Sequence, residues 1–311
     1  MEPPYKPTLT PELGEITIDD CIFVTYKWKV PDVRPLILIV HGYRDHHVLY
    51  TELAEYLVKT LNVNVFFFYQ RGEGTTRLIN GRRGIANDNH AYSAIDSMIS
   101  KSVADPTISE VHLFGHSMGG GLVLNYACGC GGRKNDTYQI SNVKSIVACA
   151  PLIELHPYTH PGQIIEWVVR FFSVLPFTRT LRVPSPLDVE AITGDPEWQS
   201  WMRAAIDPKT LNGAFIETRD FILRGRALLN DNIASSIVRG LPILVCHGDA
   251  DKINDVKASE EWVRKVNRLD NVDVTLKVYH DGRHSLMVDS PSIRSAFLQD
   301  VAVFYGSHIG N

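Results

Sequence analysis

Residues 111–121 read VHLFGHSMGGG and contain the motif Gly115-His116-Ser117-Met118-Gly119. The apolar run before the motif is typical of a strand, and residues 119–127 after it have the composition of a helix. A Gly-x-Ser-x-Gly motif at a strand-to-helix turn holds the serine in strained backbone with its hydroxyl exposed. The two glycines are expected because side chains at these positions would collide across the turn. The motif therefore predicts that Ser117 is a nucleophile.

Short apolar runs alternate with amphipathic runs on both sides of this turn. They predict strands at 36–40, 63–69, 110–114, 143–149, 241–246 and 272–279, and helices at 50–61, 91–98, 119–127, 258–266 and 292–304. Uniformly apolar strands separated by helices favour a mostly parallel sheet with helices on both faces, which is an α/β fold.

The alternation breaks in a proline-rich stretch between residues 151 and 226. We predict an inserted cap at 151–226, between a first core segment at 1–150 and a second core segment at 227–311. The cap contains an apolar helical run, residues 164–177, which includes Phe171 and Phe172. This run either packs against the core or forms a lid that contacts lipid.

Composition excludes several classes of partner. The chain has 311 residues and a formal charge of 31 − 35 = −4, with no long basic run, so we expect no nucleic-acid partner. Five cysteines, mostly in apolar segments, indicate buried thiols in a reducing compartment and no metal site. Without a signal-like start or an apolar run of about 20 residues, we expect a cytoplasmic protein that is not secreted and is at most peripheral to a membrane.

A serine hydroxyl needs a base and an orienting carboxylate, which follow it in the order Asp or Glu, then His. His284 lies in the turn after the last predicted strand and is the predicted base. The acid is expected in the loop at 247–255, where spacing leaves both Asp249 and Asp251 open. We interpret His280, at the end of the last strand, as structural.

The predicted oxyanion hole uses two backbone N–H groups. One belongs to Met118, directly after the serine, and the other to Tyr43, in the loop after the strand at 36–40. The neighbouring His41 and His116 are interpreted as structural support.

These features together resemble the monoacylglycerol lipase family of α/β hydrolases, and its fungal members in particular. The resemblance rests on His41-Gly42, Gln70-Arg71-Gly72-x-Gly74, Gly115-His116-Ser117-Met118-Gly119-Gly120-Gly121, Leu124-Asn125-Tyr126-Ala127, Ala150-Pro151-Leu152-Ile153, Gly248-x-x-Asp251 and Arg283-His284-Ser285. It implies an α/β-hydrolase fold with Asp251 as the triad acid. It also implies cofactor-free hydrolysis of a monoacylglycerol to fatty acid and glycerol through an acyl-enzyme, beneath a mobile cap that touches a membrane or lipid droplet.

Two rival interpretations stay open at this stage. A carboxylesterase, lysophospholipase or thioesterase would use the same triad with a different leaving group. A non-catalytic scaffold with this fold is disfavoured, because such proteins usually lose a member of the triad.

The chain departs from the family pattern at several positions. The family loop His-Gly-x-Gly-Glu reads His41-Gly42-Tyr43-Arg44-Asp45, so Arg44 replaces a glycine. The resemblance implies that Asp45 takes the place of a glutamate that faces the polar end of the substrate, and Asp45 is therefore the predicted substrate-binding residue. Tyr69 stands where relatives have an aspartate. Animal members have arginine in place of Leu49 and a second histidine in place of Met287.

Overall fold

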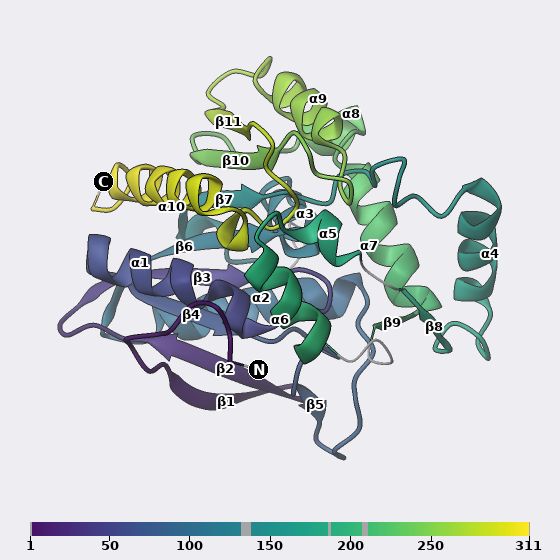
Figure 1. The fold of residues 1–311 in the computed structure, drawn as a ribbon, viewed down its shortest axis with the longest axis horizontal. Helices are drawn as coiled ribbons and strands as arrows, with labels where there is room; N and C mark the ends of the chain where they lie inside the picture. The colour runs from purple at the N-terminus through teal and green to yellow at the C-terminus, as the bar shows by residue number, and fades with distance from the viewer. Residues whose placement is uncertain (1, 132–137, 186–187, 207–210, 311) are drawn as a thin grey trace.

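The computed structural model describes residues 2–131, 138–185, 188–206 and 211–310. Its central sheet is built from strands β1 Glu12–Ile18, β2 Cys21–Trp28, β3 Arg34–Val40, β4 Asn64–Phe68, β5 Arg77–Leu78, β6 Ile108–His116, β7 Val143–Cys149, β10 Ile243–Gly248 and β11 Val274–Tyr279. The strand order is β1-β2-β4-β3-β6-β7-β10-β11, with β5 paired to β2 (Figure 1). All pairs from β4 to β11 are parallel, and β1 and β2 add an antiparallel edge.

Helices cover both faces of this sheet (Figure 1). The core helices are α1 Thr51–Leu61, α2 Asp88–Val103, α3 Met118–Ala127, α9 Val256–Val266 and α10 Pro291–Gly306. Apolar residues of α2, α3 and α9 form one buried cluster, and those of α1 and α10 form the other. Along β3, Leu36 and Leu38 belong to the first cluster, whereas Ile37 and Ile39 belong to the second. Because helices cover both faces of the sheet, successive residues of the central strands can be apolar and need not alternate with polar ones.

The predicted α/β-hydrolase fold, with a mostly parallel sheet between helices, is confirmed. Each predicted strand and helix of the two core segments is present, with ends that differ by a few residues. The hairpin of β1 and β2 was not predicted. Its outer strand, β1, has no fully buried residue, so it lacks the apolar run that marks the central strands.

The segment between β7 and β10 holds further helices and two short strands. These are α4 Gln163–Val174, β8 Arg182–Pro184, α5 Val189–Ile192, α6 Pro196–Ala205, β9 Asn212–Ala214, α7 Phe215–Ala227 and α8 Asp231–Ala234. Helix α4 lies at one side of the molecule and packs against α7, which also contacts α3 (Figure 1). The division at residues 150 and 226 stays a prediction, and α7 runs across its second boundary. Among the described residues, no helix has the length and apolarity needed to cross a membrane.

Candidate active site

Ser117 lies in a strained turn between β6 and α3. Its backbone angles are φ 53° and ψ −117°, outside the regions that L-residues favour. A Cβ atom on Gly115 would lie 2.6 Å from the Gly119 carbonyl oxygen, and one on Gly119 would lie 2.1 Å from the Val40 carbonyl oxygen. Both glycines are therefore required by close backbone contacts, as the motif predicted.

The structure brings Ser117, His284 and Asp251 together from three distant parts of the chain. The Nε2 atom of His284 lies 2.9 Å from the Ser117 hydroxyl oxygen. Its Nδ1 atom lies 2.8 Å from Oδ2 of Asp251. All three residues are buried. This is the geometry in which an imidazole accepts a proton from the serine while a carboxylate fixes its tautomer.

The Asp251 carboxylate receives two further sets of hydrogen bonds. The backbone N–H groups of Ile253 and Asn254 donate to Oδ1 at 2.7 and 3.0 Å. His247 Nε2 lies 3.1 Å from Oδ2, and its Nδ1 lies 2.8 Å from the Ser259 hydroxyl. Burial alone would raise the pKa of Asp251, but the two histidines hold this pKa well below its usual range. Sequence reasoning gave His247 no role and placed it in the loop after the strand, whereas in the structure it lies within β10.

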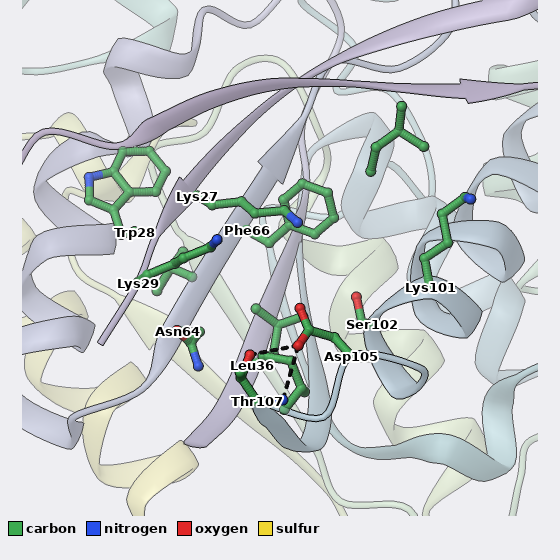
Figure 2. A pocket seen from close by; sticks show the side chains of 13 residues that line it. Lys27, Trp28, Lys29, Leu36, Asn64, Phe66, Lys101, Ser102, Asp105 and Thr107 are labelled. Atoms are coloured by element: carbon green, nitrogen blue, oxygen red, sulfur yellow. Dashed lines mark hydrogen bonds between the residues drawn. The ribbon is translucent and has the colours of Figure 1, made fainter. Parts of the chain in front are cut away.

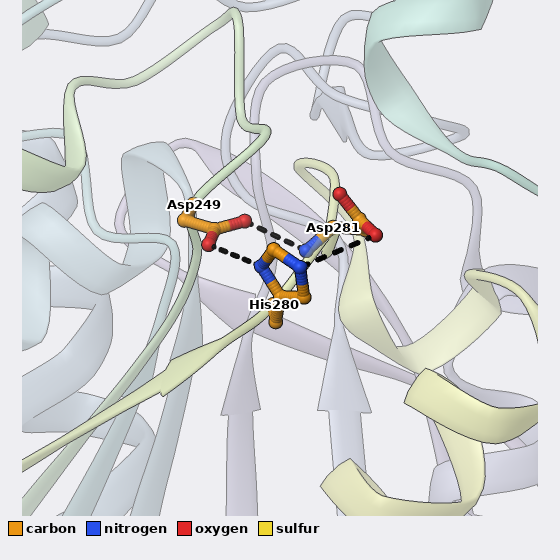
Figure 3. A group of neighbouring side chains, drawn as sticks. All are labelled: Asp249, His280 and Asp281. Carbon is orange, nitrogen blue, oxygen red and sulfur yellow. Dashed lines mark hydrogen bonds and ion pairs between the residues drawn. The ribbon is translucent and has the colours of Figure 1, made fainter.

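Asp249, the other acid that spacing allowed, lies outside the buried site. Its Oδ2 atom is 2.9 Å from Nδ1 of His280, and its Oδ1 atom accepts a hydrogen bond from the Asp281 N–H at 2.7 Å (Figure 3). All three residues are exposed. Asp249 therefore pairs with a surface histidine, and Asp251 pairs with His284.

The two predicted oxyanion donors flank Ser117. Met118 is the first residue of α3, so its N–H has no acceptor in a preceding helical turn. The loop with Tyr43 packs directly on the serine, since a Cβ atom on Gly42 would lie 3.0 Å from Ser117 Cβ. Tyr43 and Met118 line the same cavity as Ser117 and His284.

Asp45 joins this loop to His116. Its Oδ2 atom accepts hydrogen bonds from the Gly42 N–H at 2.8 Å and from the Tyr50 hydroxyl, and lies 2.9 Å from His116 Nδ1. Burial opposes ionisation of Asp45, but His116 and Tyr50 lower its pKa to about 2. His116 Nε2 in turn lies 3.3 Å from the His284 carbonyl oxygen. Asp45 lines the cavity, and Oδ2 also holds the loop in place.

His41 and Tyr69 also support the loops around the site. His41 Nε2 accepts a hydrogen bond from the Gln70 N–H at 2.9 Å, while Nδ1 lies 2.6 Å from the Gly42 carbonyl oxygen. The Tyr69 hydroxyl accepts a hydrogen bond from the His47 N–H at 3.1 Å. The phenol of Tyr69 therefore stabilises this loop. Leu49 and Met287, the other departures, are buried in the core.

A cavity of about 350 Å³ opens at Ser117 and His284. Most of its apolar wall comes from the segment between β7 and β10, and this part includes Leu152, Leu155, Ile165, Val169, Val183, Phe221 and Ile222. The cavity thus combines a polar end at the serine with walls suited to an acyl chain.

A second pocket lies at the other end of the sheet, near the amino ends of β3, β4 and β6 (Figure 2). It is lined by Lys27, Lys29 and Lys101, and the Lys27 ammonium lies 4.9 Å from the centroid of the Phe66 ring. Its volume is about 50 Å³, which is too small for a lipid ester. The cavity at Ser117 is the candidate substrate site, because it is lined by Ser117 and His284 and has room for an acyl chain.

The fold and this site together define an α/β hydrolase with a serine at the nucleophile position. A family model described as serine aminopeptidase, S33, matches residues 31–291. The chain belongs to the monoglyceride lipase family: it is 31% identical to the monoglyceride lipase of Saccharomyces cerevisiae over 98% of this chain and 96% of that protein.

One further relative and one solved structure agree with this membership. The monoacylglycerol lipase of Mycolicibacterium smegmatis is 26% identical over 92% of this chain and 94% of that protein. A crystal structure of a soluble variant of the Saccharomyces cerevisiae monoglyceride lipase in complex with a substrate analog superposes with a TM-score of 0.87. It is 27% identical and covers 100% of both chains.

Proposed function

We propose that this protein hydrolyses the ester bond of monoacylglycerols to a fatty acid and glycerol. The observation that carries the proposal is the 2.9 Å contact between Ser117 and His284 at the polar end of an apolar cavity. The match with two lipases whose names state this substrate gives further support.

In the proposed mechanism, Ser117 Oγ attacks the ester carbonyl while His284 Nε2 takes the serine proton. Asp251 stabilises the resulting imidazolium, and the N–H groups of Tyr43 and Met118 bind the oxyanion. His284 then passes its proton to the leaving glycerol oxygen, which leaves an acyl-enzyme. Water, deprotonated by His284, attacks this ester, and the proton returns to Ser117 as the fatty acid departs.

A substrate panel with one acyl chain tests the proposed leaving group. We expect the purified protein to release fatty acid from a monoacylglycerol with a higher kcat/KM than from the matching methyl ester, lysophospholipid or thioester. The glycerol ester offers hydroxyl groups that the methyl ester lacks. A higher kcat/KM on the lysophospholipid or thioester would instead favour the rival lysophospholipase or thioesterase. Absence of hydrolysis across the panel would favour a non-catalytic scaffold.

We further propose that helix α4 docks the protein peripherally on a lipid surface. Ile165 and Val169 of this helix line the cavity. The same helix exposes Ile164, Trp167, Phe171 and Val174, and Phe177 beyond its end is 91% exposed. A substrate that resides in a lipid layer would reach the cavity beside this face. With a net charge of −4, attraction would come from apolar contact rather than from a basic surface.

Replacing Trp167 and Phe171 by serine is expected to weaken binding to phosphatidylcholine vesicles at least about tenfold, since burying one large apolar side chain is worth about 1.5–3 kcal/mol. These two rings stack on each other with centroids 5.4 Å apart. Phe172 is unsuitable for this test, because it packs on Phe215 of α7. Co-sedimentation measures vesicle binding.

As a matched control, Leu13 and Val303 are replaced by serine. Both are also exposed but lie away from α4. We expect this control to bind vesicles like the unmodified protein, and both double variants to hydrolyse a short soluble ester at the unmodified rate. Equal vesicle binding by the two double variants would refute α4 as the docking surface.

A further inference from the structure

Arg44 occupies a backbone position that favours glycine. It is the third residue of the turn at 42–45, in which the Asp45 N–H donates to the Gly42 carbonyl oxygen at 3.4 Å. Its φ is 58°, in the left-handed region, as at the third position of a type II turn. A side chain at this φ costs backbone strain that glycine avoids. The arginine side chain must therefore make contacts that offset this strain.

The Arg44 guanidinium is buried between two other segments. Its Nη1 atom lies 2.8 Å from Glu73 Oε1 and donates to the Gly72 carbonyl oxygen at 2.9 Å, both in the loop after β4. Its Nη2 atom donates to the Asn212 carbonyl oxygen on β9 at 2.5 Å and lies 3.8 Å from Glu217 Oε2 on α7. The Arg44 and Glu73 side chains are only 6% and 7% exposed. Without the guanidinium, the buried Glu73 carboxylate would lose its ion-pair partner, which is costly in a site this deeply buried.

Arg44 also holds the ring of Tyr43. Its guanidinium carbon lies 4.8 Å from the centroid of the Tyr43 ring, and the Phe221 ring of α7 lies 5.6 Å from the same centroid. A guanidinium over an aromatic face is attracted electrostatically. Tyr43 is therefore fixed through its own ring and through the turn that follows it.

We propose that Arg44 is a positioning residue that aims the Tyr43 N–H at the reacting carbonyl oxygen and ties this turn to β9 and α7. The inference rests on the proposed function, in which Tyr43 supplies one of two oxyanion donors. Such donors act only when they are held near the position that the oxyanion will occupy, and small displacements are costly. The turn would lose its anchor to Glu73, Asn212 and Glu217 without the guanidinium.

Substitution of Arg44 by glycine tests this role, because glycine removes the guanidinium and suits the φ of 58°. On a short soluble ester we expect kcat to fall about 10- to 100-fold, less than the roughly 100- to 1000-fold cost of losing an oxyanion donor outright. KM should change less than about threefold, and inactivation by a fluorophosphonate should slow in parallel with kcat. Arg44→Lys, which keeps a charge but loses the planar fork, should recover part of the kcat.

The double variant Arg44→Gly, Glu73→Gln separates loss of positioning from misfolding. It removes the Glu73 carboxylate together with its partner, so Glu73 is not left as an unpaired buried charge. The double variant should show the same loss of kcat with a melting temperature near that of the unmodified protein. Arg83→Ala is the matched control: Arg83 donates to the same Gly72 carbonyl oxygen at 2.8 Å but lies outside the turn at 42–45, so kcat should not change.

A folded Arg44→Gly protein, or a folded double variant, with kcat within twofold of the unmodified protein would overturn the proposed role of Arg44. Failure of the proposed function would show in the unmodified protein instead, either as no hydrolysis of the monoacylglycerol or as a preference for another ester in the substrate panel.

Discussion

Replacing Ser117 by alanine is expected to lower kcat for monoacylglycerol hydrolysis by a factor on the order of 10⁶, as in other serine triads. Alanine removes the oxygen that lies 2.9 Å from His284 Nε2 and would form the acyl-enzyme. It keeps a Cβ atom at the strained φ of 53°, so the turn itself is unchanged. Fatty-acid release by the purified variant measures the effect.

Thr159→Val provides a control for this substitution. Thr159 also lines the cavity, but its hydroxyl donates to the Lys252 carbonyl oxygen at 2.6 Å and lies outside the proposed machinery. The kcat of Thr159→Val should stay within about threefold of the unmodified value, because valine has nearly the shape of threonine and Thr159 supplies no group to the proposed triad or oxyanion hole. A folded Ser117→Ala protein that hydrolyses the ester at near the unmodified rate would exclude Ser117 as the nucleophile.

Asp251→Asn is expected to lower kcat by a factor of about 10⁴, the size of effect that follows when a triad histidine is held in the wrong tautomer. The carboxylate accepts from His284 Nδ1 at 2.8 Å, whereas an amide can turn its NH₂ group toward this nitrogen. The pH–kcat/KM profile and the melting temperature of the variant separate a tautomer effect from misfolding.

Asp249→Asn is the matched substitution, two residues away. Asp249 is exposed and pairs with His280, and an exposed pair of this kind is screened by water and contributes little to stability. We expect its kcat to equal that of the unmodified protein. If the Asp249 variant lost activity while the Asp251 variant kept it, the proposed assignment of the acid would be reversed.

Much of the core was predictable because its signals are local. The central strands are buried on both faces, so they appear as short apolar runs, and Ser117 is marked by glycines within two residues of it. The antiparallel hairpin at the sheet edge was missed because β1 is partly exposed along its length. In helix α4, Phe172 packs on Phe215 of α7. The apolar run at 164–177 has nearly uniform composition, so the sequence does not indicate which of its side chains pack inward.

The parts of the site that the sequence left open depend on contacts across the chain. Asp249 and Asp251 are two residues apart, and only the path of the loop separates a surface pair with His280 from a buried pair with His284. The role of Arg44 was equally hidden, because its hydrogen bond to Asn212 joins residues 168 positions apart. Local periodicity holds no information about such pairs.

The central claim is that Ser117 is the nucleophile of a serine hydrolase, and covalent labelling tests it most directly. The unmodified protein is incubated with a long-chain fluorophosphonate, and intact mass and peptide mapping locate the adduct. We predict one phosphonyl group on the peptide that contains Ser117, and no adduct on the Ser117→Ala protein. An adduct on another residue, or equal labelling of the Ser117→Ala protein, would contradict the proposed mechanism.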